Sequence, residues 1–374
     1  MRQPICLIGI LYVNGGPMNR GGIETFMMNY IRHMNLKQFH IDFAVRGPER
    51  GAYDDELESL GCKIYRLPQR SKHPIDFQKK LRSILTTHNY QIIHSHADAM
   101  SSWILKIAKE CDVPVRIAHS HNTQHLTTNP IKFQLNEFAR KNINKYATDR
   151  FACSQAAGKW LFGNASFEVI HNAIETRDYA FDNEKRKTIR KKYGISDDTI
   201  LLGHVGRFDT QKNHVFLIDM FAELAKKNDN YKLMCVGDGW LRDDIEKQIK
   251  ENNLTDKVIL AGQQKNAKDF YNSFDLYVFP SLFEGLAFVL IEAQANGLTC
   301  INSDGVPQET NLSGDDKMIY FPLERKKWVD EILGLGRPER YNGEIYVIEH
   351  GYDINHEAIR LEAYYLKLAN KVIN

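Results

Sequence analysis

Short apolar runs alternate with amphipathic stretches along this chain, and the alternation starts a second time near the middle. Apolar runs bounded by turn residues predict strands, and the stretches with helical periodicity between them predict helices. Strands separated by helices predict βαβ units, in which a parallel sheet is buried on both faces. Because a parallel strand needs a long crossover, this pattern leaves few other folds open to the chain.

The first half predicts one α/β sheet and the second half predicts another, with a boundary near residues 172–182. At 374 residues the chain suits two domains of about 150–200 residues. We therefore expect a first domain over residues 1–175, a second over 176–352, and a helix over 353–374 that packs back on the first. The predicted strands are Ile5–Val13, Ile41–Val45, Lys63–Leu67, Ile92–His94, Val115–Ala118, Arg150–Ala152 and Val169–Ile170, then Thr199–Val205, Lys232–Val236, Val258–Leu260, Leu276–Phe279 and Thr299–Ile301.

Charge and composition exclude several classes of protein. The net charge of +2 gives no global field that would attract nucleic acid. The six cysteines are scattered, with no CxxC pair, which is typical of small core residues in a reducing compartment. The apolar run near the N-terminus lacks a cleavage site, and no stretch approaches the ~18 apolar residues of a membrane span. We expect a cytoplasmic protein, attached at most to the inner surface of the cell membrane.

The most specific motif follows the predicted strand Leu276–Phe279 and reads Glu284-Gly-Leu-Ala-Phe-Val-Leu-Ile-Glu292. Open α/β sheets bind ligands outside the carboxyl ends of their strands, which is where Glu284 falls. Gly285 lets the backbone approach a ligand, and a helix opening there offers N–H groups to phosphate or sugar oxygens. Glu292 lies among apolar residues, where a carboxylate is costly without a partner such as a ribose hydroxyl. Ordinary helix-surface charges are the alternative for both glutamates.

Two further loops carry residues suited to a phosphorylated ligand. Arg207 and Lys212 lie in a polar loop after the predicted strand Thr199–Val205, where two cations suit a pyrophosphate and are expected to be solvated. After the first strand, Gly21 and Gly22 allow close backbone approach, while Glu24 suits the first turn of a helix. No GxGxxG is present here, which argues against a dehydrogenase.

Two histidine pairs each follow an apolar run, as His94-Ser-His96 and His119-Ser-His121. The spacing invites a metal interpretation, but neither motif contains a carboxylate or cysteine, so a zinc site is disfavoured.

Taken together, these motifs resemble the retaining GT-B glycosyltransferases of family 4, especially the capsular and exopolysaccharide members. The E-x7-E motif, the glycine–arginine…lysine element of residues 203–214 and the GGxE turn of residues 21–24 carry the resemblance, which extends over nearly the whole chain. One departure is His171 and Ala173, where the family has a proline and a glycine. The resemblance implies two Rossmann-like doubly wound domains that face each other across a cleft, with the acceptor on the first and the nucleotide-sugar on the second.

The resemblance also implies roles for individual residues. It assigns the donor diphosphate to Arg207 and Lys212, the donor sugar to His119 and Glu284, the ribose to Glu292, and close approach to the donor to Gly21, Gly22, Gly285 and Leu286. His119 is the favoured histidine, with His121 as the alternative, because the register of the match differs by two residues between them. His94 and His96 are then expected to line the acceptor side or to stabilise their loop.

The expected reaction transfers a sugar from a nucleotide diphospho-sugar, with a UDP-sugar favoured, to a glycan or polyprenyl-linked glycan. The product is expected to retain the anomeric configuration and to belong to cell-surface polysaccharide biosynthesis. The cations Arg207 and Lys212 are expected to replace a metal, and no cofactor is implied beyond the donor itself. A nucleotide-sugar epimerase of the same architecture is the alternative, and a pyridoxal-dependent phosphorylase stays open. The basic stretch Asn183–Lys192 either contacts anionic lipid or is a solvated interdomain segment.

Overall fold

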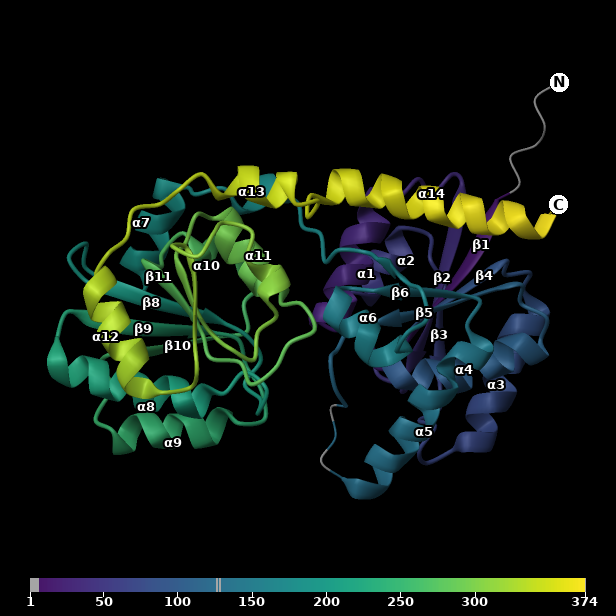
Figure 1. The fold of residues 1–374 in the computed structure, drawn as a ribbon, viewed down its shortest axis with the longest axis horizontal. Helices are drawn as coiled ribbons and strands as arrows, with labels where there is room; N and C mark the ends of the chain where they lie inside the picture. Colours follow the sequence, from purple (N-terminus) through teal and green to yellow (C-terminus); the bar gives the residue numbers. More distant parts are fainter. Residues whose placement is uncertain (1–6, 126, 128, 374) are drawn as a thin grey trace. The chain divides into compact units, whose positions relative to one another are not determined.

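A computed structural model describes residues 7–125, 127 and 129–373, with no side-chain description at 372 and 373. The chain forms two compact units. Unit 1 comprises residues 1–173 together with 354–374, and unit 2 comprises residues 174–353. Each unit is a parallel sheet with helices on its faces (Figure 1). Two residues of the predicted first strand, Ile5 and Cys6, lie outside the described residues.

Unit 1 contains a seven-stranded sheet in which every neighbouring pair of strands is parallel. The strand order reverses direction between β1 and β4, which creates a topological switch point. In sheet order the strands are β3 (Ile64–Leu67), β2 (Phe39–Arg46), β1 (Ile8–Asn14), β4 (Ile92–His96), β5 (Val115–Ser120), β6 (Asp149–Ala152) and β7 (Glu168–Val169).

The helices of unit 1 include one from the far end of the chain. Helix α14 (Ile354–Ile373) packs against α1 and β5, so the C-terminal segment completes the N-terminal unit. The other helices are α1 (Gly22–His33), α2 (Asp54–Ser59), α3 (Pro74–Thr87), α4 (Ser101–Glu110), α5 (Pro130–Tyr146) and α6 (Gln155–Phe162), with a 3₁₀ turn at Asp98–Met100.

Unit 2 repeats the arrangement with six parallel strands and a switch point between β8 and β11. In sheet order the strands are β10 (Val258–Gly262), β9 (Tyr231–Val236), β8 (Ile200–Val205), β11 (Leu276–Phe279), β12 (Cys300–Ser303) and β13 (Met318–Phe321). The helices are α7 (Asn183–Lys192), α8 (His214–Lys227), α9 (Arg242–Glu251), α10 (Lys268–Tyr271), α11 (Phe288–Ala295), α12 (Arg325–Leu335) and α13 (Gly343–Glu349), with 3₁₀ turns at Thr176–Tyr179 and Gln308–Thr310.

The sheet of unit 2 is buried on both faces, as its apolar strands predict. Successive residues of β8 join different clusters: Leu202 packs with the cluster that contains Trp328 of α12, and Leu201 packs with the cluster that contains Leu290 of α11. This alternation explains why the strands are apolar throughout instead of on every second residue.

The basic segment Asn183–Lys192 is the helix α7. Asp182 caps it by accepting hydrogen bonds from the backbone of Glu184 and Lys185. Arg190 is buried against Asp275, so this helix packs on unit 2 and does not link the two units, although Lys187, Lys191 and Lys192 on its outer side are exposed.

In the part of the chain that the structure describes, no helix combines the length and the apolar character that crossing a membrane requires.

Candidate active site

The loop after β8 carries both predicted cations, and the structure gives them different surroundings. Arg207 donates from Nε to Asp209 Oδ2 at 2.8 Å, and its side chain is 70% exposed. Lys212 donates from Nζ to Glu284 Oε1 at 2.7 Å, and its side chain is only 16% exposed. Arg207 is therefore solvated as expected, whereas for Lys212 that expectation is wrong.

Lys212 and Glu284 meet because β8 and β11 are neighbouring parallel strands, whose carboxyl ends lie on the same edge of the sheet. Glu284 is buried and also accepts a hydrogen bond from Ser281 Oγ at 2.5 Å. The Lys212 ammonium lies 4.7 Å from the centre of the Phe279 ring, which adds a cation–π contact. The switch point of unit 2 therefore holds a fixed, partly desolvated pair of opposite charges, with Arg207 on the same loop as the lysine.

Gly237 allows the loop after β9 to pack closely against the loop after β8. Gly237 has φ of 143°, and a Cβ atom there would overlap the carbonyl of Gly206. Its own backbone N–H donates to Gly262 O at 3.0 Å. The Gly237-Asp-Gly239 turn is thus structural, since it lets the loop after β9 pack against the loop that carries Arg207.

Helix α11 begins later than the sequence analysis expected. Its first residue is Phe288, so Gly285 and Leu286 belong to the preceding loop, and the helix does not open at Gly285. Leu286 is buried, with 6% of its surface exposed. The unpaired N–H groups of the first turn therefore lie further along the chain than predicted.

Glu292 lies inside unit 2 with a partner on each carboxylate oxygen. Tyr179 donates to Oε1 at 2.9 Å and Tyr271 donates to Oε2 at 2.6 Å. Burial raises the pKa of the Glu292 carboxyl, and the two tyrosine hydroxyls partly offset that rise. Each carboxylate oxygen has a second lone pair, so both can still accept a hydrogen bond from a ligand hydroxyl.

In unit 1, Gly21 and Gly22 lie where α1 begins, at the end of the loop that follows β1. The Asn14 side chain spans this loop by donating to Gly16 O at 3.2 Å and to Glu24 Oε1 at 2.8 Å. Glu24 occupies the first turn of α1, where the helix dipole favours a carboxylate. This agrees with a structural role for Glu24.

Four buried imidazoles follow, which we call the histidine stack: His94 and His96 at the end of β4, His119 in β5 and His121 just after it. The rings of His94 and His119 are nearly parallel, at 8°, and those of His119 and His121 differ by 14°. Burial lowers the pKa of all four imidazoles, to about 3 for His121, so the stack is neutral at neutral pH.

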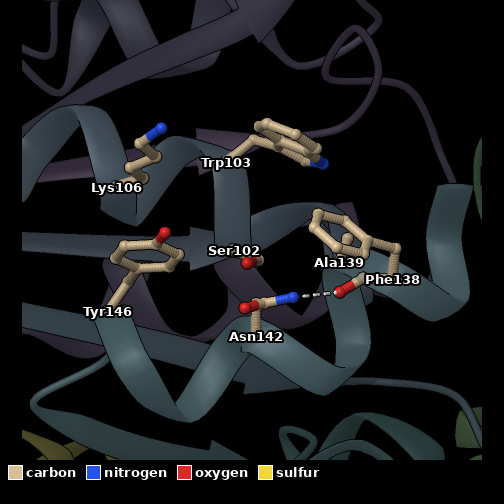
Figure 2. Close-up of a pocket in the computed structure, with 7 residues that line it drawn as sticks. All are labelled: Ser102, Trp103, Lys106, Phe138, Ala139, Asn142 and Tyr146. Carbon is tan, nitrogen blue, oxygen red and sulfur yellow. Dashed lines mark hydrogen bonds between the residues drawn. The ribbon is translucent and has the colours of Figure 1, made fainter.

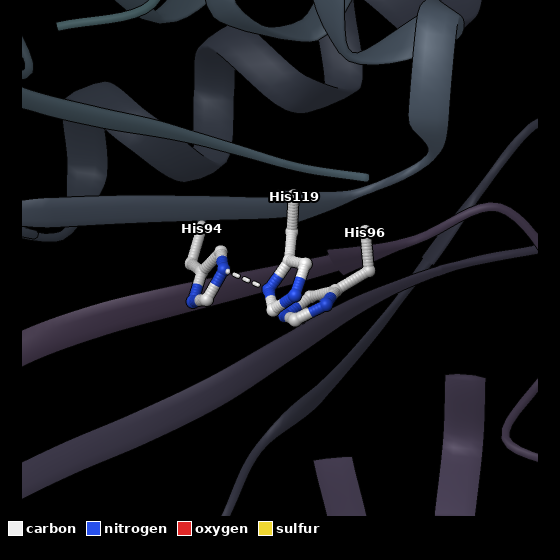
Figure 3. A group of neighbouring side chains, drawn as sticks. All are labelled: His94, His96 and His119. Atoms are coloured by element: carbon white, nitrogen blue, oxygen red, sulfur yellow. Dashed lines mark hydrogen bonds between the residues drawn. The ribbon is translucent and has the colours of Figure 1, made fainter. Parts of the chain in front are cut away.

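A chain of hydrogen bonds runs from the C-terminal helix into the stack. The hydroxyls of Tyr12 and Tyr365 lie 2.7 Å apart, and the Tyr365 hydroxyl lies 2.7 Å from His94 Nδ1. His94 Nε2 then lies 3.1 Å from His119 Nδ1 (Figure 3). His119 Nε2 and His96 Nε2 are buried and have no hydrogen-bond partner among the described residues. The hydrogen bond to His94 therefore fixes the orientation of the His119 imidazole, and its other nitrogen makes no hydrogen bond within the described part of the chain.

Potential metal-ligating nitrogens of His94, His96 and His119 lie within 4.8 Å of one another. A metal ion needs lone pairs that converge on one point. Here His94 Nε2 and His119 Nδ1 are hydrogen-bonded to each other, and their rings lie parallel. The arrangement therefore suits a hydrogen-bonded stack better than a metal centre.

Asp98 is a site residue that the sequence analysis missed. It accepts hydrogen bonds from the backbone N–H of His121 and from Asn122 Nδ2, both at 2.7 Å. Its backbone has φ of 45°, which is unusual for a residue other than glycine. The signal was available, because Asp98 follows His96 by two residues and β4 and β5 are neighbours. Asp98 fixes the loop that carries His121.

Two known family models together match most of the chain. Residues 20–178 match the family described as Glycosyltransferase Family 4, and residues 185–335 match the family described as Glycosyl transferases group 1. EpsF of Bacillus subtilis (strain 168), which is named as a glycosyltransferase, is 33% identical over 92% of both chains. The capsular polysaccharide biosynthesis glycosyltransferase CapH of Staphylococcus aureus is 27% identical over 85% of this chain and 88% of its own.

A third relative is the Escherichia coli UDP-Gal:alpha-D-GlcNAc-diphosphoundecaprenol alpha-1,3-galactosyltransferase, which is 23% identical over 80% of this chain and 78% of its own. Among solved structures, Anabaena HepE in complex with UDP-glucose superposes with a TM-score of 0.73 over 98% of both chains, at 17% identity. The fold is thus GT-B, and the chain belongs to glycosyltransferase family 4.

Proposed function

We propose that this glycosyltransferase transfers a sugar from a UDP-sugar to a lipid-linked glycan, with retention and without a metal ion. The observation that carries the proposal is the Lys212–Glu284 pair at the switch point of unit 2, with Arg207 on the same loop. A switch point is where open α/β sheets bind nucleotides. Two of the relatives support the acceptor class: CapH is named for capsular polysaccharide biosynthesis, and the Escherichia coli galactosyltransferase is named for a diphosphoundecaprenol acceptor.

The donor diphosphate carries negative charge that increases as the glycosidic bond to phosphate breaks. Arg207 is exposed and can turn toward a phosphate oxygen, because Asp209, the carboxylate that it binds, lies on its own loop. Lys212 is held by Glu284, so its ammonium is already oriented before the donor binds. Glu292 retains acceptor capacity for the ribose hydroxyls. These roles for Arg207, Lys212 and Glu292 belong to the proposal.

Retention is supported by the weak basicity of the buried imidazoles. An inverting transfer needs a base that removes the acceptor proton, and His119 has a pKa well below its usual range. A departing phosphate oxygen can take that proton on the same face of the sugar, next to the cations that bind it. NMR of the anomeric coupling in the product tests this, since a β-linkage formed from an α-donor would overturn retention.

Metal independence is supported by the two cations, which offer the stabilisation that a divalent ion would supply. The test is turnover in excess EDTA. Unchanged rates agree with the proposal, whereas activity that disappears and returns with Mg²⁺ or Mn²⁺ contradicts it.

The central experiment is a thermal-shift screen of nucleotide sugars, followed by transfer assays with the donor that stabilises the protein most. UDP-sugars should raise the melting temperature of the wild-type chain, and Arg207→Ala should reduce that shift. Stabilisation only by donors with another base would refute the UDP assignment. The epimerase alternative has no support among the relatives named above. An assay with and without acceptor tests it, because a transferase forms product only when the acceptor is present and an epimerase does not need one.

We also assign the chain to the cytoplasm, with a peripheral contact at the inner face of the cell membrane. None of the five described cysteines forms a disulfide, which suits a reducing compartment. A polyprenyl-linked acceptor would be presented at that surface, so the enzyme needs some means of reaching it.

A further inference from the structure

Helix α5 of unit 1 exposes more large apolar side chains than any other helix in the described part of the chain. Ile131, Leu135 and Phe138 are 74%, 50% and 57% exposed, and their spacing puts them on one face of the helix. The buried positions among its 17 residues are only Ala139 and Ile143. The helix lies at the margin of unit 1, where it packs on α4 (Figure 1). Its outer face is too apolar for a surface that meets only water.

Cationic side chains accompany this apolar face. Lys141 and Lys145 are exposed and follow Phe138 by three and seven residues, which keeps them on the same side of the helix. Glu137 is the one carboxylate among four cationic residues of α5. Arg140 binds both of its oxygens, at 2.7 and 2.8 Å, and lowers its pKa to about 2. Glu137 also lies 3.9 Å from Lys141 Nζ, and four cationic residues against one carboxylate leave α5 with a net positive charge at neutral pH.

A pocket lies beside this face, between α4 and α5 (Figure 2). It is lined by Ser102, Trp103, Lys106, Phe138, Ala139, Asn142 and Tyr146. Tryptophan and tyrosine side chains are enriched where membranes meet water, because each joins an apolar ring to a polar group. The indole Nε1 of Trp103 is buried and has no hydrogen-bond partner among the described residues, and the Lys106 side chain is exposed. The lining of the pocket thus combines aromatic rings with a cation.

Helix α7, which the sequence analysis considered for lipid contact, lacks these properties. Four of its six cations pair with carboxylates of unit 2: Lys185 with Asp269, Arg186 and Arg190 with Asp275, and Lys187 with Glu184, while Lys191 and Lys192 are exposed. None of the exposed large apolar residues of the described chain lies on α7. Lipid contact needs apolar insertion as well as charge, so α7 is the weaker surface.

We propose that α5 and the adjoining pocket form a docking surface for an anionic lipid bilayer. Ile131, Leu135 and Phe138 enter the boundary between head groups and acyl chains, while Lys141 and Lys145 lie at the level of the lipid phosphates. A second copy of the chain is a poorer occupant, because pairing two α5 faces would bring like charges together. The inference rests on the proposed function in one respect, since the enzyme needs to reach a membrane only if its acceptor is linked to a lipid.

The test is sedimentation of the full chain with vesicles, without donor or acceptor, so that it does not depend on activity. The wild-type chain should bind vesicles that contain phosphatidylglycerol more tightly than vesicles of phosphatidylcholine alone, and added salt should weaken the binding. Ile131→Gln/Leu135→Gln/Phe138→Gln should reduce binding at least about tenfold, because the inserted apolar groups supply much of it. Lys141→Glu/Lys145→Glu should abolish the preference for phosphatidylglycerol.

Two matched controls keep the result specific. Ile359→Gln changes an apolar residue of α14 that is 65% exposed, and Lys191→Glu/Lys192→Glu places the same charge change on α7. Both should bind vesicles like the wild type. Wild-type sedimentation by the α5 variants, or loss of binding in the α7 variant, overturns the inference. A dimer of the wild type that the α5 glutamines dissociate would also overturn it, because the face would then be a protein interface.

The outcome stays separate from that of the proposed function. If UDP-sugars stabilise the protein but vesicles do not bind, the docking surface fails and the transferase stands. If vesicles bind through α5 and no nucleotide sugar stabilises the protein, the proposed donor fails and the surface stands.

Discussion

Replacing Tyr365 by phenylalanine removes one hydroxyl from the middle of the buried chain of hydrogen bonds in unit 1. That hydroxyl joins Tyr12 to His94 Nδ1, and all three side chains are fully buried. The variant therefore leaves two polar groups without a partner, the Tyr12 hydroxyl and His94 Nδ1, in a place that water does not reach.

The magnitude follows from counting the groups that lose their partners. Each buried group left unpaired costs about 1–3 kcal/mol, so Tyr365→Phe should lower the free energy of unfolding by about 2–6 kcal/mol. Tyr12→Phe removes a hydrogen bond but leaves Tyr365 bonded to His94, and should cost about 0.5–1.5 kcal/mol. The double variant leaves only His94 Nδ1 unpaired. Adding Tyr12→Phe to the Tyr365→Phe variant should therefore restore stability by about 1 kcal/mol or more.

The measurement has to report on one unit, because a chain of two units need not unfold in a single step. Native-state hydrogen exchange of the amides in β4 (Ile92–His96) follows unit 1, and the amides of β8 (Ile200–Val205) provide an internal reference in unit 2. Exchange in β4 should accelerate in Tyr365→Phe and slow again in the double variant. Additive effects of the two substitutions, or β4 protection unchanged in Tyr365→Phe, would refute the reasoning.

Three further predictions concern the candidate site and pH. Arg207→Ala should fold like the wild type and lose roughly 10²–10³-fold in turnover. Lys212→Ala should lose turnover similarly and should also have a lower melting temperature, because the buried carboxylate of Glu284 loses its cation. Near wild-type kinetics in both variants would exclude the diphosphate role. Glu292→Gln should weaken UDP-sugar binding about tenfold in calorimetry while the fold survives, and an unchanged dissociation constant would exclude a ribose contact. The pKa values of the histidine stack are lowered from 6.5 in the folded state, so the unfolded chain binds more protons below pH 6.5. The contribution of these histidines to the free energy of unfolding should be fully present above pH 6.5. Below pH 6.5 it should fall by about 1.4 kcal/mol per pH unit for each histidine. A melting temperature that stays constant from pH 7 to 5 would contradict this.

Much of the fold was predictable, because strands buried on two faces have a simple signature. Runs such as Leu276–Phe279 are apolar at every position, and the structure has this strand where the sequence placed it. Helix α7 was harder to interpret, since its basic composition suggests solvent. Only the structure supplies Asp275, a carboxylate more than eighty residues away that binds Arg186 and Arg190. A sequence does not reveal such distant ion pairs.

The sequence located the residues of the candidate site but did not reveal which of them are in contact. Motif spacing located Lys212 and Glu284 at two strand ends, but only the strand order makes those ends neighbours. The histidine pairs were visible as pairs, while their union in one stack depends on β4 lying beside β5. Tyr365 could not have been connected to His94, because the residues are far apart in the chain and no motif links them.

The position of α14 also bears on how the chain is made. Unit 2 is one continuous segment and can complete its fold as soon as residues 174–353 have been synthesised, whereas unit 1 lacks α14 until residues 354–373 have followed. Until then α14 is absent, so the apolar surface that it buries stays exposed, and the Tyr12 hydroxyl and the His94 imidazole lack their hydrogen bonds to Tyr365. The N-terminal unit, although synthesised first, is therefore the last to become complete, and a nascent chain that stops short of Tyr365 carries an unfinished histidine stack.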